Sequence, residues 1–423
     1  MTVKSETNLS RFSPVSSQEQ YELKPRNSVK NNLQVYATAF IALFGTNYLP
    51  IEGGNGLGII KVALMGISSL ILFSLAFAPS NAMFCGILYL GYQFFIASMH
   101  PETFRWSTLL FSCGLVFSYV CFYNLLYIRQ VFRIDYFIKV AKGMMLAYFI
   151  VCLIQQMFIL VGVRYFPLIN LTSILNRGIG CNSLSMEPSS FARTMLVFYY
   201  AYVKCSEFKR GKGPYKVKEL FSGEHKWVTL RFLWMMLTMG SGTAFVCLIA
   251  FSFYFVRKNN FMLMIPVLLA GWIVLQSIEF KQLNRAVAVI EATSSLDQKT
   301  VIETDGSAAH RIVPLINSLN ADFTKFETWF GHGVDYGKNN NTFITLKGTL
   351  FDDYGVCFYL IAMLMNFVCA YRFFSLATLF MFMGVGGGAG SNIHYAWFLM
   401  MIMTCVKYFY ETSFQNHISR RCI

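Results

Sequence analysis

Residues 106–128 read WSTLLFSCGLVFSYVCFYNLLYI and contain no charged side chain. A run of roughly 17–25 predominantly apolar residues is long enough to cross the hydrocarbon core of a bilayer as a helix. A water-facing helix of this length would carry charged side chains on its solvent face. This stretch therefore predicts a membrane-spanning helix, and similar stretches flank it on both sides.

Apolar stretches of this kind recur along the chain, most of them separated by short polar turns. Those that we expect to span a membrane are residues 34–50, 57–78, 81–98, 106–128, 140–163, 189–204, 228–240, 242–256, 261–278, 350–370, 373–389 and 391–410. The pair 228–240 and 242–256 is short and joined at Gly240-Ser241-Gly242, so it is either one long helix or two helices with a re-entrant turn. The sequence thus predicts an all-α, polytopic transmembrane helical bundle of about 12 spans.

The composition agrees with a membrane protein. Of the 423 residues, 55% are hydrophobic and only 13% are charged, whereas soluble domains carry roughly 25% charged residues. The net charge of +14 would suit a nucleic-acid-binding protein. However, most of the basic residues lie in short loops between apolar spans and not along one solvated face, so we expect no nucleic acid as a partner.

The distribution of lysine and arginine predicts the topology. Basic residues are concentrated in the loops that would share one side of the membrane with both chain ends, which predicts cytoplasmic termini by the positive-inside rule. Residues 1–32 are polar and are predicted to form a disordered cytoplasmic tail, before a transmembrane domain at 33–415. Two long loops, 164–188 and the large loop 279–349, would then face the opposite side.

These two outer segments hold the candidate functional residues. The first contains Arg177 and then Glu187-Pro188-Ser189, directly before a span. Glu187 suits a purely structural role as well, because an acidic residue beside a first-turn proline stabilises the start of a helix. The second contains His310-Arg311 and Gly331-His332-Gly333, where the glycines permit a sharp turn or a close approach of the backbone.

Together these pieces resemble the O-antigen and capsule polymerases of the Wzy type, whose wider superfamily includes the O-antigen ligases. The resemblance covers about residues 140–410 and depends on the order of the motifs. The matching positions are Arg177 and Gly178, Glu187-Pro188-Ser189 with Ala192, Gly240-Ser241-Gly242, Arg311, Gly331 and Gly333, Asn341 and Thr342, and Tyr354 and Gly355. Asn340 stands where the ligases commonly carry a histidine, which favours the polymerases.

The resemblance implies a fold similar to the GT-C class of glycosyltransferases and a place in the bacterial inner membrane. It implies a metal-independent, inverting glycosyltransferase without a cofactor. The substrates would be undecaprenyl-pyrophosphate-linked oligosaccharides, polymerised at the periplasmic face into O-antigen, capsule or exopolysaccharide. Membrane lipid and a chain-length regulator protein are the expected partners, and an O-antigen ligase or a glycan transporter are the alternative functions.

The chemistry of such a transfer needs fixed cations and a base. Arginine binds phosphate oxygens with two parallel hydrogen bonds and stays charged, so Arg177, Arg311 and Arg193 are expected to bind the pyrophosphate. The acceptor hydroxyl must lose its proton as the bond forms. The expected catalytic bases are Glu187, His332 and His310.

Three further expectations concern the spans and their cysteines. The spans are predicted to bury almost no charge, which counts against a transporter, because ion and substrate pathways need charged cavities. Gln155 and Gln156 lie in an apolar span and are expected to make interhelical hydrogen bonds. Cys181 falls in the first outer segment, without an evident partner.

Overall fold

The protein is helical throughout its described part. The computed structural model describes residues 23–46, 65–71, 73, 77–163, 179–185, 187–255, 288, 291, 299–300, 303, 322–336, 348–372 and 394–419. Its main helices are α1 (Leu23–Gly45), α3 (Asn81–Met99), α4 (Trp106–Tyr127), α5 (Ile134–Leu160), α6 (Pro188–Arg210), α8 (Lys226–Thr238), α9 (Gly242–Ser252), α16 (Gly348–Met365) and α18 (His394–Ser419). Within these ranges there is no β-strand, so the all-α class is confirmed for them.

Four of the described helices are long and apolar enough to cross a membrane. These segments are Asn81–Met99, Trp106–Tyr127, Ile134–Leu160 and Asp352–Ala370. Each overlaps a span predicted from the sequence. The predicted spans 261–278 and 373–389 lie outside the described residues, as does most of 57–78. The total of about 12 spans and the likeness to the GT-C class therefore stay predictions.

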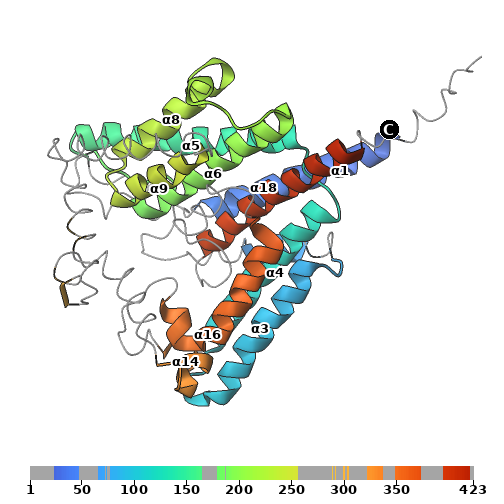
Figure 1. The fold of residues 1–423 in the computed structure, drawn as a ribbon, viewed down its shortest axis with the longest axis vertical. Helices are drawn as coiled ribbons and strands as arrows, with labels where there is room; N and C mark the ends of the chain where they lie inside the picture. The colour runs from blue at the N-terminus through green and yellow to red at the C-terminus, as the bar shows by residue number, and fades with distance from the viewer. Residues whose placement is uncertain are drawn as a thin grey trace, which may run out of the picture.

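The described helices form two groups joined by a central pair. In Figure 1, α5, α6, α8 and α9 lie together on one side, and α3, α4 and α16 lie together on the other. Helix α18 (red) runs between the groups beside α1 (blue), and it packs against both α6 and α4. Residues far apart in the sequence therefore meet along α18.

Helix α6 is the least apolar of the long helices and also among the most buried. Nearly every residue of α6 is buried, including the tyrosines Tyr199, Tyr200 and Tyr202. The surrounding helices expose apolar side chains instead, as at Met157 and Leu160 of α5, which are 66% and 74% exposed. Polar groups inside and apolar groups outside are the arrangement expected in lipid, where exposed polar groups are costly.

Helices α8 and α9 are two separate helices, which decides between the two sequence alternatives. The chain turns at Gly240, whose φ of +69° lies in the left-handed region. Ser241 then begins α9, since its Oγ accepts a 3.3 Å hydrogen bond from the Thr243 N–H. With 13 and 11 residues, the helices are only about 20 and 17 Å long at 1.5 Å per residue, which is short of a full span.

One end of the bundle gathers the basic loops, and we call it the basic end. Lys209 at the end of α6 lies 2.6 Å from the Asp135 carboxylate at the start of α5. Phe208 contacts Tyr410 late in α18, with ring centroids 5.6 Å apart, and the Arg372 guanidinium lies over the same tyrosine ring. The Tyr127 hydroxyl at the end of α4 donates a 2.9 Å hydrogen bond to Glu411 late in α18. The starts of α4 and α6 therefore lie toward the opposite end, which we call the distal end.

The boundary between the N-terminal tail and the helical domain differs from the predicted one. Helix α1 begins at Leu23, inside the segment 1–32 that the sequence predicts as a disordered tail. Residues 1–22 lie outside the described part.

Candidate functional site at the distal end

The described residues 180–185, which precede α6, form a largely buried, irregular loop. Cys181, Asn182 and Ser183 are all buried against α5. The Gln155 side chain donates a 3.1 Å hydrogen bond to Asn182 Oδ1 and accepts one of 2.7 Å from the Ser183 N–H. Non-helical backbone at the depth of a membrane helix needs such partners, because hydrocarbon offers none. Residues 181–183 of the predicted outer loop 164–188 are thus buried against α5, and the side of the membrane that this loop faces stays a prediction.

The two glutamines of α5 and Cys181 have clear partners. Gln156 donates a 2.7 Å hydrogen bond to Thr238 Oγ1 and accepts one of 3.1 Å from the Trp234 indole N–H. This confirms the expected interhelical bonds, whereas Gln155 serves the loop instead. The Cys181 Sγ lies 3.2 Å from Cys152 Sγ in α5, so the expectation that Cys181 has no evident partner is wrong.

The backbone of Glu187 forms the N-terminal cap of α6. Its φ and ψ are extended, its carbonyl accepts a 3.0 Å hydrogen bond from the Phe191 N–H, and Pro188 follows in the first turn. No side-chain hydrogen bond caps this helix start. The exposed carboxylate instead accepts a short hydrogen bond from the Ser189 hydroxyl. The structural role seen here therefore depends on the backbone of Glu187 and leaves its carboxylate at the surface of the bundle.

Arg193 lies half-buried between α6 and α18. Its Nη1 donates a 3.0 Å hydrogen bond to the Tyr395 hydroxyl, while its Nε is buried without a hydrogen-bond partner. Among the described residues, no carboxylate lies within ion-pair distance of this guanidinium. A buried cation is costly unless an anion or several acceptors satisfy it. Arg193 thus has unused capacity to bind an anion.

Helix α6 also corrects the expectation that the spans bury almost no charge. It buries Lys204 and Glu207, whose Nζ and Oε1 atoms form a 2.7 Å ion pair, and it also carries the half-buried Arg193. Asp353 near the start of α16 is buried as well. A low content of charge within the spans therefore cannot be used against a transporter.

A second cluster at the distal end is formed by residues 331–336 and the start of α16. The N–H groups of His332 and Gly333 donate hydrogen bonds of 2.9 and 3.0 Å to the carbonyls of Asp352 and Asp353. Gly331 has a φ of +77°, and a Cβ on it would lie 2.3 Å from the Asp353 carbonyl oxygen. Only glycine permits this approach, which is the role that the Gly-x-Gly motif suggested.

Gly355 completes the same contact from the other side. It interrupts α16 with a φ of +72°, and a Cβ there would lie 2.4 Å from the Trp329 backbone. The Tyr92 hydroxyl of α3 donates to the Tyr354 carbonyl at 3.2 Å and lies 3.4 Å from that of Trp329. The motif residues Gly331 and Gly333 of the loop and Gly355 of α16, predicted from the sequence separately, thus lie at one close contact between the loop and the helix.

His332 is held at this contact. Its ring stacks on Tyr336 with centroids 4.5 Å apart, and its Nδ1 lies 3.2 Å from the Asp352 carbonyl oxygen. Both contacts fix the ring orientation. A base must reach substrate, so this arrangement supports a positioning role for His332 better than proton transfer.

Several polar residues near these sites were missed by sequence reasoning. Asp335 accepts a 2.7 Å hydrogen bond from Thr108 Oγ1 and lies 3.8 Å from Arg105 Nη1, which joins the loop to the start of α4. The consecutive acids Asp352 and Asp353, at the mouth of an apolar span, were a visible signal. Tyr395 had no such signal, because its role depends on its contact with Arg193.

The remaining predicted residues are not placed. Arg177, Arg311 and His310 lie outside the described residues, so their convergence on one cavity stays a prediction. Within the described ranges, no three His, Cys, Asp or Glu side chains are grouped as metal ligands. No family model, curated protein or solved structure matches this chain.

Proposed function

We propose that this chain is a membrane glycosyltransferase that polymerises undecaprenyl-pyrophosphate-linked oligosaccharides, as the Wzy-type polymerases do. The order of the sequence motifs supports the class. The observation that carries the proposal is Arg193, a half-buried cation in a helical bundle with a buried Nε that has no partner. Intramembrane cations of this kind mark substrate sites more often than they stabilise the fold.

The chemistry of the transfer explains why such an arginine is useful. When the sugar leaves its lipid pyrophosphate carrier, negative charge develops on the bridging oxygen. A fixed guanidinium stabilises that charge, and it does so most strongly where water is excluded. Tyr395 holds one edge of Arg193 through Nη1 and so orients the rest of the group. Arg177 and Arg311 would add cations within roughly 12 Å, the reach of a pyrophosphate held by bidentate contacts.

Glu187 is the proposed base. It lies six residues before Arg193, so the two residues are about 9 Å apart along the axis of α6. Its carboxylate is exposed, so a substrate hydroxyl can approach it, and an ionised carboxylate accepts several hydrogen bonds at once. His310 and His332 are the alternatives for this role. The anionic leaving group and the acceptor would thus both be served from the first turns of one helix.

The proposed location follows from the two ends of the bundle. The basic end, which holds the start of α1 and the end of α18, would face the cytoplasm of a bacterial inner membrane, and the distal end would face the periplasm. Under this orientation, Arg193 and Glu187 lie toward the side where lipid-linked repeat units are polymerised.

The test compares variants in a strain that lacks the chromosomal copy and receives the gene on a plasmid. The wild-type chain should restore long surface polysaccharide, and Arg193→Gln should leave single lipid-linked repeat units. The matched control is Arg231→Gln, because Arg231 is a partly buried arginine of α8, 5.9 Å from the Phe149 ring and outside the α6–α18 contact. Long polymer that accumulates without attachment to its lipid anchor would indicate the ligase. Normal, attached polymer in the deletion strain would exclude both.

A further inference from the structure

A rigid, basic and partly apolar segment lies at the basic end, between α6 and α8. We call residues 211–227 the basic platform. Its exposed lysines are Lys212, Lys216, Lys218 and Lys226. Beside them the platform exposes large apolar side chains, with Val217 53%, Phe221 43% and Trp227 63% exposed. Exposed apolar side chains indicate an interaction or membrane surface when they form one continuous patch.

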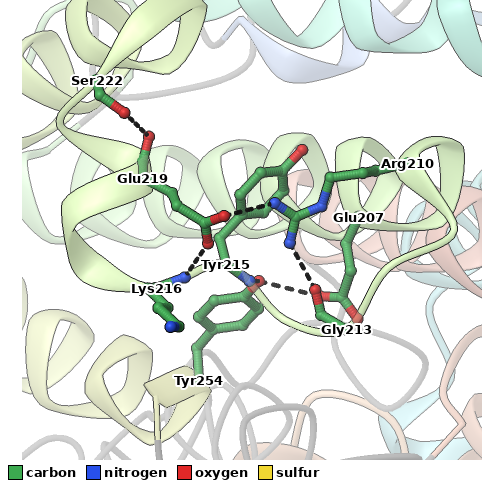
Figure 2. A network of polar contacts seen from close by, with 8 residues as sticks. All are labelled: Glu207, Arg210, Gly213, Tyr215, Lys216, Glu219, Ser222 and Tyr254. Atoms are coloured by element: carbon green, nitrogen blue, oxygen red, sulfur yellow. Dashed lines mark hydrogen bonds and ion pairs between the residues drawn. The ribbon is translucent and has the colours of Figure 1, made fainter.

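A polar network holds the platform in place. Figure 2 shows the residues of this network around the end of α6. The Glu207 carboxylate, paired with Lys204, accepts a 3.0 Å hydrogen bond from the Tyr254 hydroxyl. The same hydroxyl accepts a 2.8 Å hydrogen bond from the Tyr215 N–H. The platform backbone is thus tied to a buried ion pair.

Arg210 makes the second attachment. Its guanidinium lies 3.8 Å above the Tyr215 ring, donates 2.9 Å to Glu219 Oε1, and donates 2.7 Å to the Gly213 carbonyl (Figure 2). Together the two attachments hold the platform at Gly213, Tyr215 and Glu219. Its lysines are therefore presented on an ordered backbone.

The acids near the platform already have partners. Glu219 pairs with Arg210 and also accepts a 2.6 Å hydrogen bond from the Lys216 N–H, while Glu224 lies 3.3 Å from Lys142 Nζ. Among the described residues, no carboxylate lies within ion-pair distance of the four platform lysines. The platform therefore carries uncompensated positive charge.

The apolar side chains continue from the platform along α8. Trp227, Leu230, Trp234 and Leu237 are all exposed, and their spacing of three and four residues places them on one face of the helix. Such a face belongs in hydrocarbon. Because this face is continuous with Trp227, the platform lies where the hydrocarbon ends and the lipid headgroups begin. Tryptophan beside lysine is typical of that boundary.

We propose that the basic platform binds the anionic headgroups of phospholipids in the leaflet at the basic end, with its four lysines on the phosphates and Phe221 and Trp227 inserted beside the acyl chains. Charge complementarity favours an anionic lipid over a zwitterionic one. The continuous apolar face favours lipid over a soluble polyanion, because a soluble polyanion has no acyl chains for Trp227 to contact. This binding does not depend on the proposed polymerase activity.

The test titrates the purified full-length protein in detergent with tetraoleoyl cardiolipin, dioleoylphosphatidylglycerol or dioleoylphosphatidylcholine. Bound lipid is counted by native mass spectrometry. The variant carries Lys212→Gln, Lys216→Gln, Lys218→Gln and Lys226→Gln together, and its thermal unfolding is compared with the wild type. A charge-reversal pair, Lys218→Glu against Lys325→Glu, gives the matched control, because Lys325 is exposed on the loop before α14 (Phe326–Phe330) at the distal end.

We expect anionic lipids to bind in preference to phosphatidylcholine, and the fourfold variant to bind them at least roughly tenfold more weakly. Lys218→Glu should weaken binding more than Lys325→Glu, and added salt should weaken it in the wild type. Equal binding of anionic and zwitterionic lipid would overturn the proposal, as would unchanged binding in a folded fourfold variant. Binding of a single-stranded oligonucleotide in preference to anionic lipid would also overturn it, in favour of a nucleic-acid surface.

Discussion

The hydroxyl of Tyr395 accepts a 3.0 Å hydrogen bond from Nη1 of Arg193, and this bond joins residues 202 positions apart in the sequence. Two residues further on, Trp397 packs edge-on against Tyr89 of α3, with ring centroids 5.7 Å apart. One turn of α18 thus connects both groups of helices. The orientation of Arg193 depends on how α18 is seated between them.

The first prediction concerns the planar guanidinium group of Arg193, which can donate two parallel hydrogen bonds. Arg193→Lys should lower polymerisation by roughly 10²–10³-fold, since an ammonium cannot make parallel hydrogen bonds to a phosphate. Tyr395→Phe should cost about tenfold or less, because it removes one orienting hydrogen bond worth about 0.5–1.5 kcal/mol. The rate of transfer from purified lipid-linked oligosaccharide measures both effects. Equal rates in Arg193→Lys and the wild type would remove Arg193 from the site.

The second prediction separates the two roles of Glu187. Glu187→Gln keeps the backbone that begins α6 and keeps an acceptor for Ser189, but an amide cannot take up a proton at neutral pH. We expect normal membrane levels and loss of long polymer. Ser189→Ala, which removes only the hydroxyl, should retain most activity. Polymer of normal length in Glu187→Gln would show that Glu187 has only a structural role. A histidine would then be the expected catalytic base.

The third prediction tests the glycine packing at the distal end. Gly331→Ala should destabilise the protein by more than about 1–3 kcal/mol, because a strained positive φ is added to a contact with fixed backbone. Gly143→Ala in α5 is the control, since nothing lies within 4 Å of its added Cβ. It should be neutral or stabilising by about 0.5–1 kcal/mol. Thermal unfolding in detergent compares them, and similar midpoints would contradict the packing argument.

The fourth prediction concerns the buried ion pair of α6. Lys204 and Glu207 have side chains only 6% and 11% exposed. Glu207→Gln should cost about 3–5 kcal/mol, because it leaves the ammonium buried and uncompensated. The double variant Lys204→Met with Glu207→Leu should recover most of that loss. If the double variant is as unstable as the single one, the pair contributes through its geometry and not through its charge.

The fifth prediction is a pH dependence from His225, which lies before α8 and contacts the Tyr202 hydroxyl. Burial lowers the pKa of His225 below its usual 6.5, so the folded state prefers the neutral ring. Stability is therefore fully present above pH 6.5 and falls as the pH decreases below it, because the unfolded chain binds the proton more readily. The slope should approach 1.36 kcal/mol per pH unit at most. Unfolding midpoints of the wild type and His225→Gln, measured between pH 5 and 8, should converge toward low pH.

The sequence alone predicted the class and the position of several helices, for a physical reason. Residues 106–128 are apolar without interruption, and the helix occupies Trp106–Tyr127. Gly240 and Ser241 interrupted the next apolar region, and there the chain turns between α8 and α9. The length of an apolar stretch and the presence of turn-forming residues are properties of consecutive residues, so the sequence shows them directly.

Only the tertiary structure decided which polar residues meet. The buried loop at 181–183 depends on Gln155, and Arg193 depends on Tyr395; neither pairing has a local signature. The glycines 331 and 355 were each visible as motifs, but their common purpose appears only when the turn packs against α16. Contacts between distant segments are set by the packing of whole helices, and a single sequence does not encode that packing in any short stretch.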